Sequence, residues 1–155
     1  MMRVLAIQMN DVTDSLAVSL FSEILTVDQL ARNRVAKALP KGMELSHFSV
    51  LNHLAHTQSE RSPAQLARTF HLTRGAMTNT LGKLEWAGWV HIRPDWEDAR
   101  RKMVSISPSG LSARDAGLAA ITPLVADVVS RVGDDKVRAI LPILREMRVR
   151  LADKG

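Results

Sequence analysis

The sequence predicts a mainly α-helical fold with one small β-hairpin. Three observations lead to this class: long stretches with apolar residues every three or four positions, two short capped helices near the middle, and two alternating segments around a charged loop. With 155 residues and 46% hydrophobic content, the chain can form one domain with its own core. Aromatic residues make up only 4%, so Leu, Val, Ile, Ala and Met must build that core.

Residues 10–39 are predicted to form one long helix. Asn10 or Asp11 can cap its start, and Pro40 and Gly42 can end it. Its apolar residues recur four, four, three, four and four positions apart along one stripe: Leu16, Leu20, Ile24, Val27, Ala31 and Val35. A stripe of more than about five turns is long for a small globule. We therefore expect a helix of a second subunit to bury it.

Other amphipathic helices flank the central region. Ser46 is expected to cap a helix over 47–57, and Ser109 a helix that continues to about Arg131. A last helix follows Gly133, and both C-terminal helices contain an internal proline.

The central region contains two helices joined by a tight turn. Ser62 precedes Pro63, and Gln65 can complete a capping box with Ser62, which is a strong helix start. Thr73 can cap a second helix over 74–87, which Gly88 ends.

Two short strands follow, over 89–93 and 103–107, with the charged loop 94–102 between them. A hairpin of this size is not stable alone in water and must pack on the neighbouring helices. Residues 46–107 are therefore predicted to form a winged helix-turn-helix.

The second helix of this pair has two chemically different faces. Met77, Leu81 and Leu84 form the apolar face. Opposite them lie Arg74, Gly75, Thr78, Asn79, Gly82, Lys83 and Trp86, a face interpreted as free of acids. Arg and Asn can bond guanine and adenine in the DNA major groove, and a helix N-terminus attracts phosphate. Each glycine costs about 1 kcal/mol relative to alanine inside a helix, so another surface is expected to come close.

The charge distribution points to the same region. The chain has a net charge of +5, and the stretch from Arg61 to Lys102 holds eight basic and four acidic residues. Asp98 can hold Arg100 in a fixed fork, ready for a narrow minor groove. The alternative, a self-neutralising surface turn, is equally consistent with the local charges.

The residues from Asp98 to Gly110 resemble the wing and the following helix start of MarR-type regulators, which show Asp-x-Arg, basic residues, a short strand, then Ser or Thr and a Gly. Leu72 to Thr78, Leu81, Leu84, Glu85, Gly88 and Val90 are similar to the recognition helix of that family and its exit. The similarity extends over roughly residues 12–152.

The resemblance implies a homodimer formed by helices 10–39 and 109–152, within a single MarR-like chain 1–155. It implies a cytoplasmic transcriptional regulator, more often a repressor, that binds a palindromic operator in double-stranded DNA. A small-molecule effector would release the regulator from DNA. Its pocket is expected among the first, second and fifth helices. The family often has a basic residue where Asn79 stands and a polar one where Gly82 stands. The expected DNA contacts are Ser62, Thr73, Arg74, Gly75, Thr78, Asn79, Lys83, Asp98, Arg100, Arg101 and Lys102.

Several function classes are disfavoured. The absence of cysteine excludes disulfides and thiolate metal sites. No apolar run reaches membrane-spanning length, and the first nine residues lack a signal-peptide pattern. We expect no cofactor and no enzymatic activity, since there is neither a nucleophile motif nor a phosphate-binding glycine loop.

Two alternatives remain. One is a winged helix that binds proteins without reading DNA. The other is a metal-responsive regulator that uses histidines, of which the chain has His47, His53, His56, His71 and His91.

Overall fold

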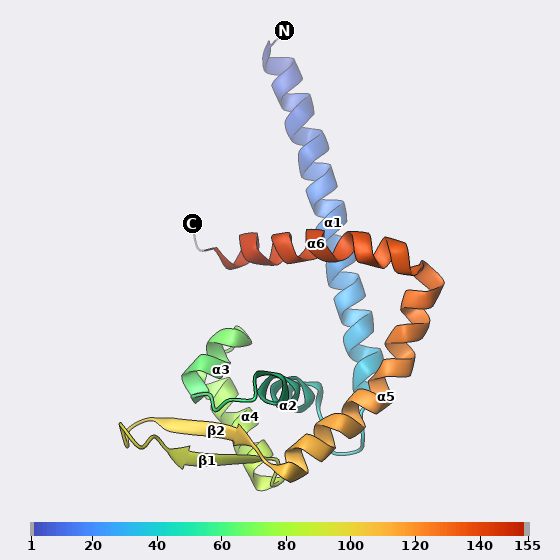
Figure 1. The fold of residues 1–155 in the computed structure, drawn as a ribbon. Helices are drawn as coiled ribbons and strands as arrows, with labels where there is room; N and C mark the ends of the chain where they lie inside the picture. The colour runs from blue at the N-terminus through green and yellow to red at the C-terminus, as the bar shows by residue number, and fades with distance from the viewer. Residues whose placement is uncertain (1, 154–155) are drawn as a thin grey trace. The chain divides into compact units, whose positions relative to one another are not determined.

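The computed structural model describes residues 2–153, with side chains from residue 12 onward. Helix α1 (Met2–Ala38) makes up one compact unit, and the chain from Leu39 onward makes up another (Figure 1). The second unit contains α2 (Leu45–Thr57), α3 (Pro63–Thr69), α4 (Arg74–Trp86), β1 (Val90–Pro94), β2 (Lys102–Ile106), α5 (Pro108–Val132) and α6 (Asp134–Ala152). The predicted fold class, mainly helical with one hairpin, is confirmed.

Helix α1 begins earlier than the sequence analysis predicted. It starts at Met2, so Asn10 and Asp11 lie inside it, and the prediction that one of them caps the helix is wrong. The residues before Asn10 include neither Gly nor Pro and are mostly good helix formers, so nothing there stops a helix. Along the stripe, Leu16 and Val27 are more than half exposed, as are neighbouring residues such as Leu30.

The second unit is built around a single hydrophobic core. α2, α3, α4 and β2 contribute its largest fully buried side chains: Val50, Leu51, Leu54, Leu66, Met77, Leu81, Leu84 and Val104. As the composition requires, aliphatic side chains and one methionine make up this set. The core connects the helix-turn-helix to α2 and to the hairpin.

Helix α2 is capped differently from the prediction. Its N-cap is Glu44, whose backbone N–H donates to Nδ1 of His47 at 3.2 Å. Ser46 lies within the first turn, so its predicted capping role is wrong. The reason is that a side chain at the third helical position can reach back to the cap, and His47 does so here.

The start of α5 is also capped by a different serine. The Ser107 hydroxyl accepts from the Gly110 N–H at 2.9 Å and donates to the Gly88 carbonyl at 2.6 Å. Pro108 is at the first helical position, so the prediction of Ser109 as the cap is wrong. A Cβ at Gly110 would lie 1.9 Å from the Trp89 carbonyl oxygen, so glycine is required for this close approach.

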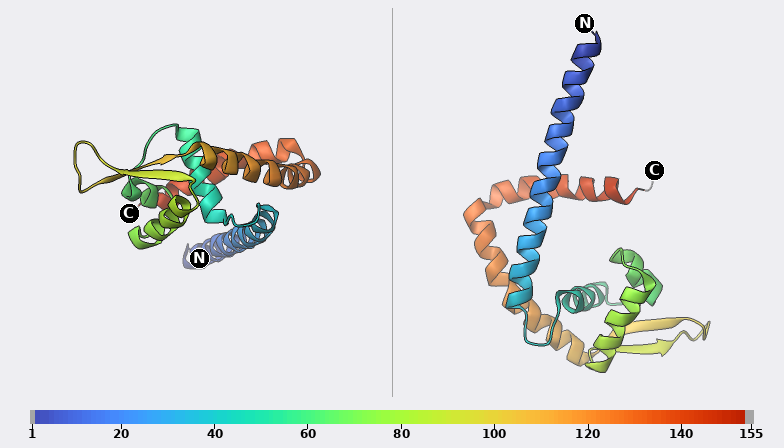
Figure 2. Two further views of the ribbon diagram at one scale, coloured as in Figure 1. Left: turned by 90° about the horizontal axis from the view of Figure 1, so that it is seen from below. Right: turned by 180° about the vertical axis from the view of Figure 1, so that it is seen from behind.

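The hairpin pairs β1 with β2 in antiparallel register, from Val90 opposite Ile106 to Pro94 opposite Lys102. Both strands lie within one residue of their predicted positions. Arg61, just before α3, bonds the outer edge of β2: its N–H donates to the Val104 carbonyl at 3.0 Å and its carbonyl accepts from Val104 at 2.8 Å. The loop between the strands projects away from α2 to α5 in both views of Figure 2. We call this loop, residues 94–102, the wing.

The C-terminal helices α5 and α6 contain Pro123 and Pro142, respectively. Within the described residues, no single helix is both long and apolar enough to cross a membrane; α5 and α6 taken together pass on length and composition, with a bend of 104° between them.

Candidate nucleic-acid interface

The two helices of the central motif begin at the predicted caps. The Ser62 hydroxyl accepts from the Gln65 N–H at 3.2 Å, and the Ser62 N–H donates to Oε1 of Gln65 at 2.8 Å. The Thr73 hydroxyl accepts from the Ala76 N–H at 3.1 Å. Both cap predictions are confirmed. These bonds satisfy backbone groups that would otherwise be unpaired at a helix start.

Helix α4 presents the two faces expected from its sequence. Met77, Leu81 and Leu84 are at most 2% exposed and pack into the core. The opposite face is open to solvent and carries Arg74, Gly75, Thr78, Asn79, Gly82, Lys83 and Trp86. Gly88, with a φ of +77°, ends the helix as predicted.

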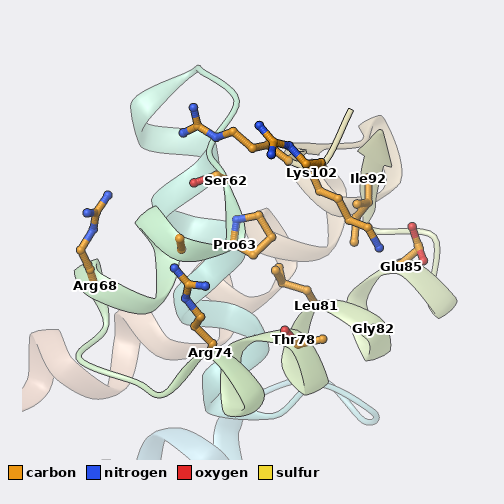
Figure 3. A pocket seen from close by; sticks show the side chains of 13 residues that line it. Ser62, Pro63, Arg68, Arg74, Thr78, Leu81, Gly82, Glu85, Ile92 and Lys102 are labelled. Atoms are coloured by element: carbon orange, nitrogen blue, oxygen red, sulfur yellow. The ribbon is translucent and has the colours of Figure 1, made fainter. Parts of the chain in front are cut away.

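A cleft of about 650 Å³ lies between α4, the start of α3 and the wing. We call it the α4–wing cleft. Figure 3 shows side chains from separate elements around it: Arg68 and Arg74 come from the two helices and Lys102 from the hairpin. The residues that line it are Ser62, Pro63, Ala64, Arg68, Arg74, Thr78, Leu81, Gly82, Glu85, Ile92, Arg100, Arg101 and Lys102. Five of these are cationic and one is acidic.

That acid corrects one interpretation of the sequence. Glu85 is exposed and lines the cleft with Thr78 and Gly82, so this side of α4 is not free of acids. The helical geometry explains the position: Glu85 follows Thr78 by seven residues, which places it within about 20° on the wheel. The cations still outnumber the acid, and the cleft remains a favourable place for an anion.

The wing holds its first arginine in a fixed position. Arg100 donates from Nε to Oδ1 of Asp98 at 3.1 Å and from Nη2 to Oδ2 at 3.5 Å, and the Arg100 backbone N–H also donates to Oδ1 at 3.1 Å. The predicted Asp98–Arg100 fork is therefore present in the structure. These hydrogen bonds from Arg100, first the side-chain bonds and then the backbone bond, hold the pKa of Asp98 below its ordinary value. The Arg100 side chain is nevertheless 91% exposed.

Among the other predicted contacts, Thr73 caps α4 and Gly75 lies on its exposed face, and the rest fall into two groups. Arg74, Thr78, Arg101 and Lys102 line the α4–wing cleft. Ser62 also lines it but is 5% exposed, with its hydroxyl engaged as a cap. Arg68 and Pro63 line the cleft without having been predicted. Arg68 is an exposed cation in α3, the helix that precedes α4, and this position could have marked it as a candidate DNA contact.

Asn79 and Lys83 lie on the other flank of α4. With Thr78, Gly82, Trp86 and residues of neighbouring segments, they surround a second hollow of about 490 Å³. The Lys83 ammonium is 3.6 Å from Oε1 of Glu44, and both side chains are at least half exposed. A surface ion pair of this kind is weak and leaves Lys83 available to another anion.

The histidines do not converge on one site. His47 is 6% exposed and packs its ring edge against Trp89, with centroids 6.3 Å apart, whereas His53 packs against Phe70. Across residues 12–153, no group of three His, Asp or Glu side chains is arranged to hold a metal ion.

Comparison with known proteins decides the family of this region. Residues 41–101 match the family model of the MarR family, a stretch that includes α2, α3, α4, β1 and the wing up to Arg101. The winged-helix region belongs to the MarR family. The match contains the Asp98–Arg100 pair on which the resemblance was based.

Solved MarR-family structures share the fold over most of the chain. The transcriptional regulator BldR from Sulfolobus solfataricus is 27% identical, with a TM-score of 0.76 over 86% of this chain and 94% of its own. A mutant MarR from E. coli in complex with operator DNA is 22% identical, with a TM-score of 0.75 over 83% of this chain and 92% of its own. MepR from S. aureus, in its DNA-binding conformation, is 19% identical, with a TM-score of 0.73 over 84% and 98%. A sequence comparison with curated proteins found no match.

Proposed function

We propose that this MarR-family protein is a sequence-specific transcriptional repressor that binds double-stranded DNA as a homodimer and is released by a small-molecule effector. One observation carries the proposal. The α4–wing cleft brings Arg68, Arg74 and the wing cations Arg100 to Lys102 beside the outward face of α4. A helix flanked by cations on a single surface suits the major groove and its phosphates.

Helix α4 supplies the groups that would read bases. Arg74, Thr78 and Asn79 are exposed, and their side chains can bond guanine, a phosphate or thymine, and adenine, respectively. Gly75 and Gly82 support a close approach, because an added Cβ at either position would have no heavy atom within 4 Å. Packing within the chain therefore gives no reason for glycine there.

The wing supplies a contact outside the major groove. Arg100 is held by Asp98 and remains 91% exposed, so it can enter a minor groove with little further loss of side-chain freedom. Arg101 and Lys102 are also exposed and add cations for the adjoining phosphates. Charge alone would bind any sequence, so we assign specificity mainly to α4.

A homodimer is supported by the exposed apolar side chains of the terminal helices. Leu16 in α1 is 69% exposed, and Ile143 and Leu151 in α6 are 58% and 68% exposed. Long apolar stripes of this kind are normally buried against another chain. A two-fold dimer would present two copies of α4 and so select a palindromic site, with half-sites about 34–36 Å apart. DNA binding itself is supported by two proteins of the same fold, E. coli MarR in complex with operator DNA and MepR in its DNA-binding conformation.

Selection of bound duplexes from random DNA tests the proposal directly. We expect a palindromic consensus and an affinity that decreases steeply with salt, with a log–log slope of about −0.9 for each phosphate neutralised. A triple variant, Arg100→Ala, Arg101→Ala and Lys102→Ala, is the matched control and should reduce that slope. Negligible affinity for every duplex at low salt would refute DNA binding and favour the protein-interaction alternative.

The effector is tested in the same assay. Candidate small molecules are added to the selected complex, and release is measured together with the mass of the free protein in solution. Release by a compound that leaves the dimer intact supports the ligand-controlled repressor. If the protein is a monomer at micromolar concentration, the dimer part of the proposal fails, whatever the DNA result.

A further inference from the structure

The wing carries an exposed tryptophan that the proposed function does not use. Trp96 is 82% exposed, although tryptophan is scarce in this chain, which has three. Exposing so large an aromatic surface to water is unfavourable, and such residues are enriched where a partner covers them.

One face of this indole rests on a fixed cation. The guanidinium carbon of Arg93 lies 4.7 Å from the centroid of the Trp96 ring. Arg93 is itself immobilised: its Nε donates to Oε1 of Glu60 at 3.0 Å, its Nη2 donates to the other carboxylate oxygen, and its Nη1 donates to the Pro94 carbonyl at 2.8 Å. Glu60 lies between α2 and α3, so the indole is supported from the body of the domain. Its opposite face is open.

The loop that presents Trp96 is internally bonded. The Asp95 N–H donates to the Arg101 carbonyl at 2.9 Å, and the Glu97 N–H donates to Oδ1 of Asp95 at 3.1 Å. The same short loop presents Arg100 through its pair with Asp98. Trp96 and Arg100 are therefore presented by one preorganised loop, which lowers the entropic cost of binding a partner with both side chains.

We propose that the open face of Trp96 packs against the deoxyribose backbone at the edge of the DNA minor groove, next to the position taken by Arg100. This inference rests on the proposed DNA binding and adds an apolar contact to a set that is otherwise polar or cationic. DNA fits better than an apolar protein surface, because the same short loop carries the exposed cations Arg100, Arg101 and Lys102, whose charge phosphates would neutralise. Glu97 is the exposed acid beside it and should be a repulsive neighbour.

Substitution separates this contact from the cationic ones. Trp96→Ala should weaken operator binding about tenfold, in line with the loss of one aromatic contact to nucleic acid. Trp96→Phe should retain most of the affinity, because a ring still covers the sugar. Since no charge is removed, the salt slope should stay unchanged, whereas Arg100→Ala should reduce it by about one for each wing. Glu97→Ala, the matched control in the same loop, should not weaken binding.

A double-mutant cycle distinguishes contact from positioning. If Trp96 touches DNA itself, Trp96→Ala should weaken an Arg100→Ala protein by a similar factor. If Trp96 only holds the wing in place for Arg100, the second substitution should have no further effect, and the proposed contact is overturned.

Fluorine NMR reports directly whether DNA covers Trp96. A purely structural role of Trp96 would not change its solvent exposure on binding. In protein labelled with 5-fluorotryptophan, the Trp96 resonance is assigned by its absence in Trp96→Phe. On addition of operator, it should shift and become protected from broadening by a soluble gadolinium chelate. Normal operator binding without protection of Trp96 would contradict the proposed Trp96 contact but not the proposed DNA binding. If the wild-type protein binds no duplex, both the contact and the DNA binding are refuted.

Discussion

Arg100 is tied to Asp98, two residues before it, by three hydrogen bonds, from Nε and the backbone N–H at 3.1 Å each and from Nη2 at 3.5 Å. Yet its side chain is 91% exposed. Ion pairs usually cover part of a cation, but here the carboxylate lies beside the guanidinium and leaves its outer edge open. The pair therefore holds an exposed guanidinium in a fixed position.

We expect Arg100→Ala to weaken operator binding by about 1–3 kcal/mol, or roughly five- to 150-fold, because a preformed cationic contact is lost. Fluorescence anisotropy with labelled operator measures this change. Size-exclusion chromatography should show the same oligomeric state as the wild type, since Arg100 is exposed in the wing. Unchanged affinity would show that the wing is a self-neutralising turn.

Asp98→Asn should cause a smaller loss of affinity than Arg100→Ala, because the cation remains but is held less well. Its pKa is already below the ordinary carboxylate value, so Asp98 is ionised throughout the pH range of a normal binding assay. The ratio of wild-type to variant affinity should therefore be the same at pH 6 and at pH 8. A ratio that changes across this range would mean that another titrating group controls the wing.

Asn79→Ala should relax sequence preference more than it lowers nonspecific affinity, because Asn79 is exposed on the outward face of α4 and can bond a base edge. Competition between the selected operator and single-base variants measures this. Lys83→Ala, one turn further along the same flank, is the matched control and should weaken all duplexes alike. A uniform loss for Asn79→Ala as well would make it a backbone contact.

Gly82→Ala should stabilise the fold while weakening DNA binding. An added Cβ meets no heavy atom within 4 Å, and alanine is favoured over glycine in a helix interior by about 1 kcal/mol. Urea unfolding should therefore shift to higher denaturant, whereas the extra methyl group should hinder a closely approaching groove. Affinity that is unchanged or improved would indicate that no surface comes near Gly82.

His47 makes folding stability sensitive to pH. Burial lowers its pKa from the ordinary 6.5, a shift that Glu44 opposes and Lys83 reinforces. The folded protein thus favours the neutral ring, so stability is intact above pH 6.5 and decreases as the pH falls toward the lowered value, because the unfolded chain binds the proton first. Protonation of Nδ1 would also remove the acceptor of the Glu44 N–H.

His47→Gln tests that account. A glutamine at the third helical position can accept the same cap bond, as Gln65 does for Ser62 at 2.8 Å. Urea unfolding between pH 5 and pH 8 should show a weaker decrease at low pH in this variant than in the wild type. His53 also has a pKa lowered by burial, and by Arg61 and His56, so His53→Gln is the parallel control for the remaining decrease. An identical pH profile in wild type and His47→Gln would contradict the prediction.

Predictions from the sequence succeeded where the interacting residues lie within a few positions of each other. The caps at Ser62 and Thr73 and the fork between Asp98 and Arg100 involve residues two or three positions apart, and all are present. Ser107 caps α5 in place of Ser109, because its hydroxyl also bonds the carbonyl of Gly88, nineteen residues earlier. The interpretation of the outward face of α4 as free of acids failed because Glu85 was left out of it, although the seven-residue spacing from Thr78 already places Glu85 there.

Local periodicity and capping chemistry determined the approximate positions of the helices and the hairpin and most of the outward face of α4, whereas the resemblance of the wing motif suggested the family. They could do so because backbone hydrogen bonds and side-chain alternation act over a few residues. Tertiary structure alone decided that Arg68 joins Arg74 and the wing cations in one cleft, and that Arg93 is anchored to Glu60 beneath Trp96. These relationships link residues whose separation in the chain carries no periodic signal. The Asp98–Arg100 pair could be predicted from two residues close in the sequence, whereas the support of Trp96 by Arg93 and Glu60 depends on the packing of the domain.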